Sequence, residues 1–279
     1  MIYNAIEKAR YILAALFLVS LAPKAEAQEL IVFNSENLKC NDTIFVFTPQ
    51  GWTADSPTTP ALFLLHGWSG DFHNWNDKAD IQAMSDKYGF IIITPDGFYN
   101  SWYLNNIDKT KMQWRDFFDQ ELYPRISERY NLNPQKTFIT GLSMGGHGAI
   151  NIYIDDTTRF RSAGSMSGVL DLHEIRLKET EITEVLGPYT KENTLFTESS
   201  AINRVATIAE SKNILLISCG YDDSLAESSR EFAKECAKYD IPYILLMSPG
   251  NHSWKYWIFA LDQHLFIFSK IANGEELGY

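Results

Sequence analysis

The chain has 279 residues, with 24 Lys or Arg against 35 Asp or Glu, and its formal net charge is −11. This balance excludes a general nucleic-acid binder and electrostatic docking on anionic lipid, because both depend on clustered Lys and Arg. Three cysteines are also too few for a disulfide scaffold.

The first 27 residues have the pattern of a secretory signal peptide. Basic residues at 8 and 10 precede the apolar run 11–22, and Ala-Glu-Ala at 25–27 supplies the small residues that signal peptidase requires. The apolar run is shorter than the roughly 20 residues that span a bilayer. We expect cleavage before Gln28, a secreted or periplasmic protein, and no membrane insertion once the signal is removed.

Strand-like and helix-like segments then alternate along the chain. Short apolar runs bounded by turn residues predict strands, and helical spacing of apolar residues predicts helices. In chain order we expect strands 44–47 and 61–65, helix 76–88, strand 90–94, helix 114–130 kinked at Pro124, strand 138–140, helix 144–154, strand 160–165, a polar irregular stretch 171–199, strand 214–218, helix 224–239, strand 243–247 and helix 253–272. This order predicts an α/β fold with a mostly parallel sheet covered by helices on both faces, in one domain over residues 28–279.

One pentapeptide carries the clearest chemical signal. Gly141-Leu142-Ser143-Met144-Gly145 lies between a predicted strand and a predicted helix. Gly-x-Ser-x-Gly in that context is the pattern of a nucleophile elbow, in which the serine projects from a tight turn. Ser143 is therefore the candidate nucleophile, and it needs a histidine base and a carboxylate to orient that base.

Chain order narrows the choice of base and acid. Of the four histidines after Ser143, only His252 follows a strand and a short turn. His147 and His264 lie in predicted helices and are expected to be structural, and His173 lies in the irregular stretch with no strand before it. The acid should follow strand 214–218. Two adjacent carboxylates there, Asp222 and Asp223, compete for that role, and their position alone leaves both open.

Several further segments extend the pattern over nearly the whole chain: 64–67 (LLHG), 94–97 (TPDG), 141–149 (GLSMGGHGA), 219–223 (CGYDD) and 250–254 (GNHSW). With these motifs the chain resembles the esterase D / putative esterase family of α/β-hydrolases, which includes S-formylglutathione hydrolases, feruloyl and acetyl-xylan esterases, and mycolyltransferases. The resemblance implies an α/β-hydrolase fold and a triad of Ser143, Asp223 and His252. It also implies that the backbone N–H groups of Trp68 and Met144 form the oxyanion hole.

Aromatic residues gather in the same loops as these candidates. Trp102, Tyr103 and Trp254 are candidate substrate contacts, because aromatic faces suit a sugar ring or an aromatic acyl group. For Trp68, Trp75, Tyr99 and Trp257 we favour packing, with Trp257 as the clearest core candidate. The group His66, Asp71, His73 and Asp96 is not interpreted as a metal site: His66 is expected to support the oxyanion loop, and the other three are expected to be surface loop residues. We expect no metal and no cofactor.

These patterns predict a secreted or periplasmic serine esterase that works through an acyl-enzyme. Export argues against a glutathione thioester, which is a cytosolic substrate, and favours acetyl or feruloyl groups on polysaccharides. The expected partner is thus a small ester or an acylated glycan. One alternative is an acyltransferase to a sugar hydroxyl, and another is a non-catalytic glycan-binding protein on the same fold. The odd cysteine count leaves at least one thiol unpaired; Cys219 is expected to be buried, and the state of Cys40 is open.

Overall fold

The computed structural model describes residues 28–54, 56, 59–173 and 181–277. The expected signal peptide lies outside these residues, as does part of the irregular stretch 171–199. No helix in the described segments is long and apolar enough to cross a membrane.

An eight-stranded sheet forms the centre of the described chain. Its strands are β1 (Gln28–Ser35), β2 (Cys40–Phe47), β3 (Ala61–Leu65), β4 (Ile91–Pro95), β5 (Thr137–Gly141), β6 (Ser162–Met166), β7 (Leu215–Gly220) and β8 (Tyr243–Ser248). They lie in the order β1-β2-β4-β3-β5-β6-β7-β8, in which β2 is antiparallel to both neighbours and all pairs from β4 to β8 are parallel. The expected mostly parallel sheet is confirmed.

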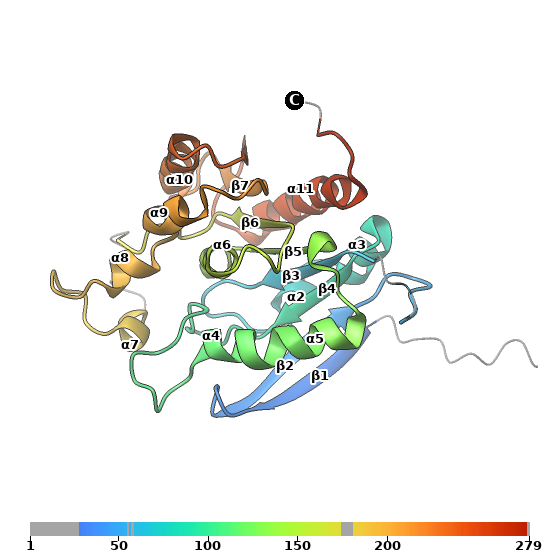
Figure 1. Cartoon of the computed structure of the whole chain (residues 1–279), viewed down its shortest axis with the longest axis horizontal. Helices are drawn as coiled ribbons and strands as arrows, with labels where there is room; N and C mark the ends of the chain where they lie inside the picture. Colours follow the sequence, from blue (N-terminus) through green and yellow to red (C-terminus); the bar gives the residue numbers. More distant parts are fainter. Residues whose placement is uncertain (1–27, 55, 57–58, 174–180, 278–279) are drawn as a thin grey trace, which may run out of the picture.

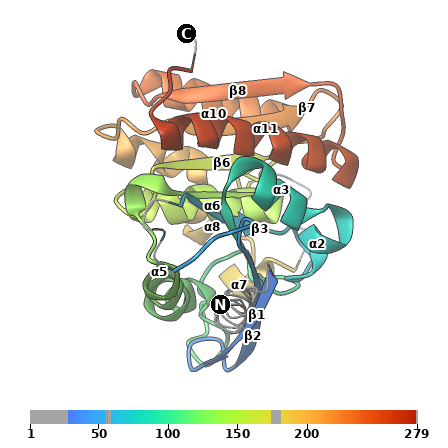
Figure 2. The same cartoon turned by 90° about the vertical axis from the view of Figure 1, so that its right-hand side faces the viewer.

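Helices cover both faces of this sheet (Figure 1; Figure 2). One face packs against α2 (Asn74–Lys78), α3 (Ile81–Tyr88) and α11 (Trp254–Asn273), and the other against α4 (Trp114–Phe117), α5 (Tyr123–Tyr130), α6 (Met144–Asp155) and α10 (Ala226–Lys238). Along β3, Phe63 and Leu65 join the core on one face, while Leu62 and Leu64 join the core on the other. This double burial explains why the parallel strands are continuous apolar runs.

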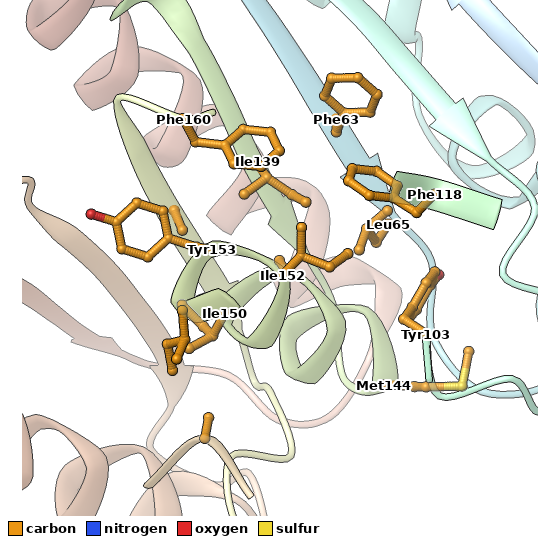
Figure 3. Close-up of a cluster of buried hydrophobic side chains, with 14 of the residues drawn as sticks. Phe63, Leu65, Tyr103, Phe118, Ile139, Met144, Ile150, Ile152, Tyr153 and Phe160 are labelled. Carbon is orange, nitrogen blue, oxygen red and sulfur yellow. The ribbon is translucent and has the colours of Figure 1, made fainter. Parts of the chain in front are cut away.

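The core beneath α6 is packed with aromatic and branched side chains (Figure 3). The ring of Phe63 on β3 lies edge-on to Phe118 and Phe160, with centroids 5.6 and 6.0 Å apart. Every residue of α6 from Met144 to Ile154 is buried. A helix that is buried all round lies in the protein interior, and α6 is therefore a fixed base for the turn that precedes it.

The helix predicted at 76–88 is two helices, α2 and α3. The backbone is extended at Ala79 (φ −142°, ψ 153°), and the Asp80 carboxylate accepts a hydrogen bond from Ala83 N–H at 2.9 Å. An aspartate cap satisfies one of the free N–H groups at a helix start. This cap begins a second helix, which ends as predicted at Gly89 with a left-handed φ of 70°.

The helix predicted at 114–130 is continuous but contains a π-helical turn at Phe118–Leu122, between α4 and α5. Pro124 lies in the first turn of α5, just after this wider turn. Proline has no N–H to donate, and its ring clashes with a carbonyl of the preceding helical turn. The local widening of the helix is the response to that clash.

One strand and several short helices were not predicted from the sequence. Strand β1 was not predicted, although it pairs with β2 over its whole length. Within 171–199 the described residues contain the short helices α7 (Thr183–Leu186) and α8 (Leu195–Ser199), and α9 (Ala201–Arg204) follows. The three cysteines are free thiols, and Cys219 is buried as expected.

The Asp80 cap can be tested directly. Asp80→Ala is expected to lower the free energy of unfolding by about 1 kcal/mol, since it removes the hydrogen bond that starts α3. Chemical denaturation of wild type and variant measures the difference. Glu192→Ala is the control, because Glu192 is exposed and its carboxylate has no hydrogen bond or ion pair with any described residue. Equal effects of the two substitutions would contradict the cap.

Candidate active site

Ser143 occupies the turn between β5 and α6. Its backbone has φ 51° and ψ −115°, a region that non-glycine residues rarely adopt. The glycines on either side are required by space. A Cβ on Gly141 would lie 2.5 Å from the Gly145 backbone, and a Cβ on Gly145 would lie 2.5 Å from the carbonyl oxygen of His66. The Gly-x-Ser-x-Gly pattern therefore has the strand–turn–helix context of a nucleophile elbow.

Two other loops leave the same edge of the sheet. Asp223 follows β7, and His252 lies between β8 and α11. Because β5, β7 and β8 run parallel, their carboxyl ends lie along one edge, where ligands bind in open α/β sheets. Residues far apart in the sequence are thus brought next to Ser143.

The three side chains form a hydrogen-bonded series. His252 Nδ1 lies 2.9 Å from Asp223 Oδ2, and His252 Nε2 lies 3.0 Å from Ser143 Oγ. A carboxylate only accepts hydrogen bonds, so the proton of the imidazole is on Nδ1 and Nε2 is free to accept from the serine hydroxyl. This arrangement makes His252 a base for Ser143.

Asp223 is held in its ionised form. Its side chain is fully buried, whereas that of His252 is 35% exposed. Burial acts to raise the pKa of Asp223, but hydrogen bonds from His252 and from Leu225 N–H outweigh it and lower the pKa below its usual value. Ser167 also acts to lower the pKa of this carboxylate, and nothing in the sequence motif pointed to it.

The structure distinguishes the two adjacent carboxylates. Asp223 contacts His252, whereas Asp222 is exposed and lines a separate cavity of about 580 Å³ that contains neither Ser143 nor His252. That cavity is larger than the cleft at Ser143, but none of the three hydrogen-bonded side chains lines it. Asp222 thus lies outside the series.

Two backbone N–H groups beside Ser143 have no partner. In the part of the chain that the structure describes, neither Trp68 N–H nor Met144 N–H donates a hydrogen bond, although the N–H groups of Ser69 and Gly145 do. Unpartnered donors next to a nucleophile are suited to stabilising an oxyanion. The expected pair of donors is therefore available in the right loops.

His66 holds the loop that carries Trp68. Its Nε2 accepts from Gly97 N–H at 2.7 Å, so its Nδ1 carries the proton and donates to the Gly67 carbonyl at 2.8 Å. The expected supporting role of His66 agrees with these contacts. Among the described residues, no group of three or more His, Cys, Asp or Glu is arranged to hold a metal ion.

Ser143 and His252 open onto a cleft of about 440 Å³. Trp254 lines this cleft, in line with its expected position near substrate. Trp257, expected in the core, is only 8% exposed yet also lines the cleft, and its ring lies edge-on to His252 with centroids 4.9 Å apart. The other lining residues are Gly67, Trp68, Ser69, Asn74, Leu142 and Ser253.

Trp102 and Tyr103 are not substrate contacts, which corrects the sequence prediction. Each is only 1% exposed. The Tyr103 hydroxyl donates to the His66 carbonyl at 2.8 Å, and Trp102 Nε1–H donates to Asn100. Both residues have left-handed backbone conformations, and both belong to the core beneath α6, where Figure 3 shows Tyr103. They support the loops from behind.

Two of the remaining histidines, His147 and His264, are structural, as expected. His147 and His264 are fully buried, and burial lowers the pKa of each to about 3. His264 bridges Thr140 and Ser218. His173 contacts Tyr189 and Thr197 rather than Ser143.

Comparisons with known proteins find similar sequences and structures. A family model described as "Putative esterase" matches residues 35–267. An acetyl esterase of Caldicellulosiruptor saccharolyticus is 27% identical over 252 residues, covering 81% of this chain and 92% of the relative. The S-formylglutathione hydrolase of Arabidopsis thaliana is 25% identical over 257 residues, covering 83% and 88%. The solved structure of fluorophosphonate-binding serine hydrolase F from Staphylococcus aureus matches with a TM-score of 0.77 at 23% identity, over 87% of this chain and 98% of that one.

The assignment of the carboxylate leads to a paired test. Asp223→Asn is expected to lower the rate at which a fluorophosphonate labels Ser143, on the order of 10⁴-fold, because an amide stabilises the wrong imidazole tautomer. Asp222→Asn is the matched control and should leave the rate unchanged. Labelling followed by intact-protein mass spectrometry gives both rates, and the reverse ranking would overturn the assignment.

Proposed function

Since the chain belongs to the putative esterase family, we propose that Ser143, His252 and Asp223 are the catalytic triad of this serine esterase. The observation that carries the proposal is the hydrogen-bonded series from Ser143 Oγ through His252 to Asp223, at 3.0 and 2.9 Å. It gives each residue a distinct chemical role.

The reaction begins when Ser143 Oγ attacks the ester carbonyl while His252 Nε2 takes its proton. The imidazolium that forms is stabilised by the buried Asp223 carboxylate, which stays ionised. Negative charge develops on the carbonyl oxygen, and the N–H groups of Trp68 and Met144 donate to it. Donors of this kind strengthen their interaction as the transition state forms.

The tetrahedral intermediate formed by this attack then breaks down. The bond to the alcohol oxygen breaks, His252 returns its proton to that oxygen, and the acyl group remains on Ser143. Water next attacks the acyl-enzyme with His252 again as base, and the carboxylic acid leaves as Ser143 recovers its proton. The cycle needs no group beyond the protein and water.

The substrate class that fits best is an ester of a small acyl group. The cleft of about 440 Å³ falls within the range of small-molecule sites, and Trp254 and Trp257 form its apolar wall. The relative that is 27% identical over most of its length is named an acetyl esterase. Acetyl or feruloyl groups on a polysaccharide are the proposed natural targets.

The proposed location is outside the cytoplasm, in the periplasm or secreted. Its support is the sequence of the first 27 residues, with a basic start, an apolar run and a small-residue cleavage site before Gln28. A glutathione thioester would be out of reach in that compartment. An acylated glycan or small ester would be accessible there.

The central test is hydrolysis of p-nitrophenyl acetate, acetylated xylan and methyl ferulate by wild type and Ser143→Ala. We expect wild type to hydrolyse at least p-nitrophenyl acetate, and the variant to lose activity on the order of 10⁶-fold. Ser269→Ala, on the outer part of α11, is the control and should retain full activity. Circular dichroism confirms that each variant is folded.

Two results would reject this proposal. One is a wild-type protein without activity on any of the three esters, which would favour the non-catalytic glycan-binding alternative. The other is a folded Ser143→Ala variant that is as active as wild type.

Hydrolysis and acyl transfer share one acyl-enzyme and differ in what attacks it. We expect hydrolysis, so acetate and p-nitrophenol should be released in equal amounts even when xylobiose is added as an acceptor. Chromatography of the products measures both. Acetate well below p-nitrophenol, with acetylated xylobiose in its place, would assign the protein as an acyltransferase.

A further inference from the structure

A second cavity, of about 240 Å³, lies between the loop after β4 and the segment that contains α7. Its lining combines the aromatic residues Phe98 and Tyr99 with the polar side chains of Asn100, Asn106, Lys111 and Glu184. It shares no residue with the cleft at Ser143. The proposed chemistry therefore leaves this cavity without a role.

The second cavity adjoins the catalytic cleft through one aromatic pair. Trp68 lines the cleft and Tyr99 lines the second cavity, and their rings meet edge to face with centroids 5.1 Å apart. Ser69 N–H also donates to the Tyr99 carbonyl at 2.8 Å. A substrate that extends out of the cleft past Trp68 would therefore contact Tyr99 next. The two rings are 38% and 51% exposed, so a ligand can reach both.

The walls of the cavity are preformed. Asn100 Nδ2–H donates to the Glu181 carbonyl and Asn106 Nδ2–H donates to the Glu184 carbonyl, both at 2.8 Å. Ile107 N–H donates to the Val185 carbonyl at 3.0 Å. These three bonds fasten the loop after β4 to the segment around α7. A ligand therefore meets a shaped site and need not order it.

Three polar side chains that line the cavity take no part in the bonds that hold its walls together. Among the described residues, the Glu184 carboxylate and the Tyr99 hydroxyl take part in no hydrogen bond or ion pair, and the Lys111 ammonium has no hydrogen bond, although its charge helps to lower the pKa of Asp108. They offer a donor, an acceptor and a group that can be either. Their partner should carry several hydroxyls, since a hydroxyl both donates and accepts. An apolar ligand would remove water from both charges without replacing its hydrogen bonds.

We propose that this cavity is a glycosyl subsite, which binds a sugar unit in the alcohol part of an acylated glycan while the acyl carbon lies at Ser143. One face of the sugar ring packs against Tyr99, and its hydroxyls bond Lys111 and Glu184. The volume suits a single ring, because it lies below the roughly 300 Å³ at which drug-sized sites begin. This inference rests on the proposed esterase function and adds to it the place where the sugar part of the substrate binds.

The test compares two substrates of one enzyme. Tyr99→Ala is expected to lower kcat/KM for acetylated xylo-oligosaccharides about 10-fold, the effect of losing one aromatic contact and its buried area. Its kcat/KM for p-nitrophenyl acetate, which has no sugar, should remain within about 2-fold of wild type. Tyr99→Phe should retain most of the activity on the sugar substrate, because the packing face is kept.

The polar side chains have their own variants. Glu184→Gln and Lys111→Met should each lower kcat/KM for the acetylated oligosaccharides about 10-fold without changing that for p-nitrophenyl acetate. A larger effect of Lys111→Met on oligosaccharides that carry a uronic acid would identify an acidic sugar as the occupant, and equal effects would identify a neutral one. Tyr243→Ala is the control, because Tyr243 is a partly exposed tyrosine on β8 outside both cavities.

The outcomes separate this inference from the esterase function. If Tyr99→Ala affects both substrates equally, Tyr99 only supports the loop of Trp68 and the subsite is rejected. The subsite is also rejected if Tyr99→Ala, Glu184→Gln and Lys111→Met all leave kcat/KM for the oligosaccharides unchanged. Both results leave the esterase function intact. That function fails if wild type hydrolyses no ester, or if folded Ser143→Ala is as active as wild type. In either case, binding of unacetylated xylotriose to Ser143→Ala, measured by tryptophan fluorescence, still tests the subsite.

Discussion

The close approach of the Ser143 turn to the end of β3 is the constraint on which the rest of the site depends. A side chain on Gly145 would lie 2.5 and 2.6 Å from the carbonyl oxygens of His66 and Leu65, so only glycine allows this contact. The contact sets the start of α6 beside the loop that carries Trp68. Backbone N–H groups from two separate segments, Trp68 and Met144, are therefore brought to the cleft at Ser143. The backbone of Ser143 is strained there, with a φ of 51°.

Burial then decides which polar groups can take part in chemistry. His147 and His264 are fully enclosed, which lowers their pKa to about 3 and keeps them uncharged at neutral pH. His252 is 35% exposed and has a buried carboxylate behind it, so a positive charge on its ring is compensated when it takes a proton. The same fold thus makes two histidines structural and leaves a third, His252, able to take a proton from Ser143.

The loops at the carboxyl edge of the sheet give each aromatic residue a different environment. Tyr103 turns inward, where its hydroxyl holds the His66 carbonyl, while Trp68 and Tyr99 stay partly exposed above it. His66 in turn joins the loops after β3 and β4 by accepting from Gly97 N–H. Buried residues that support these loops and exposed residues that can contact a ligand are therefore neighbours in the same loops.

The sequence by itself determined the alternation of strands and helices, the elbow at Ser143 and the position of His252, because these are set by local patterns and chain order. Only the tertiary structure decided the rest. Chain order left Asp222 and Asp223 open, the family resemblance implied Asp223, and the structure brings Asp223 to His252. It also buried Trp102 and Tyr103, divided the helix at Ala79 and set Tyr99 beside Trp68. The reason is physical: the direction of a side chain and its distance from another loop depend on backbone conformation and on neighbours remote in sequence, which residue types do not record.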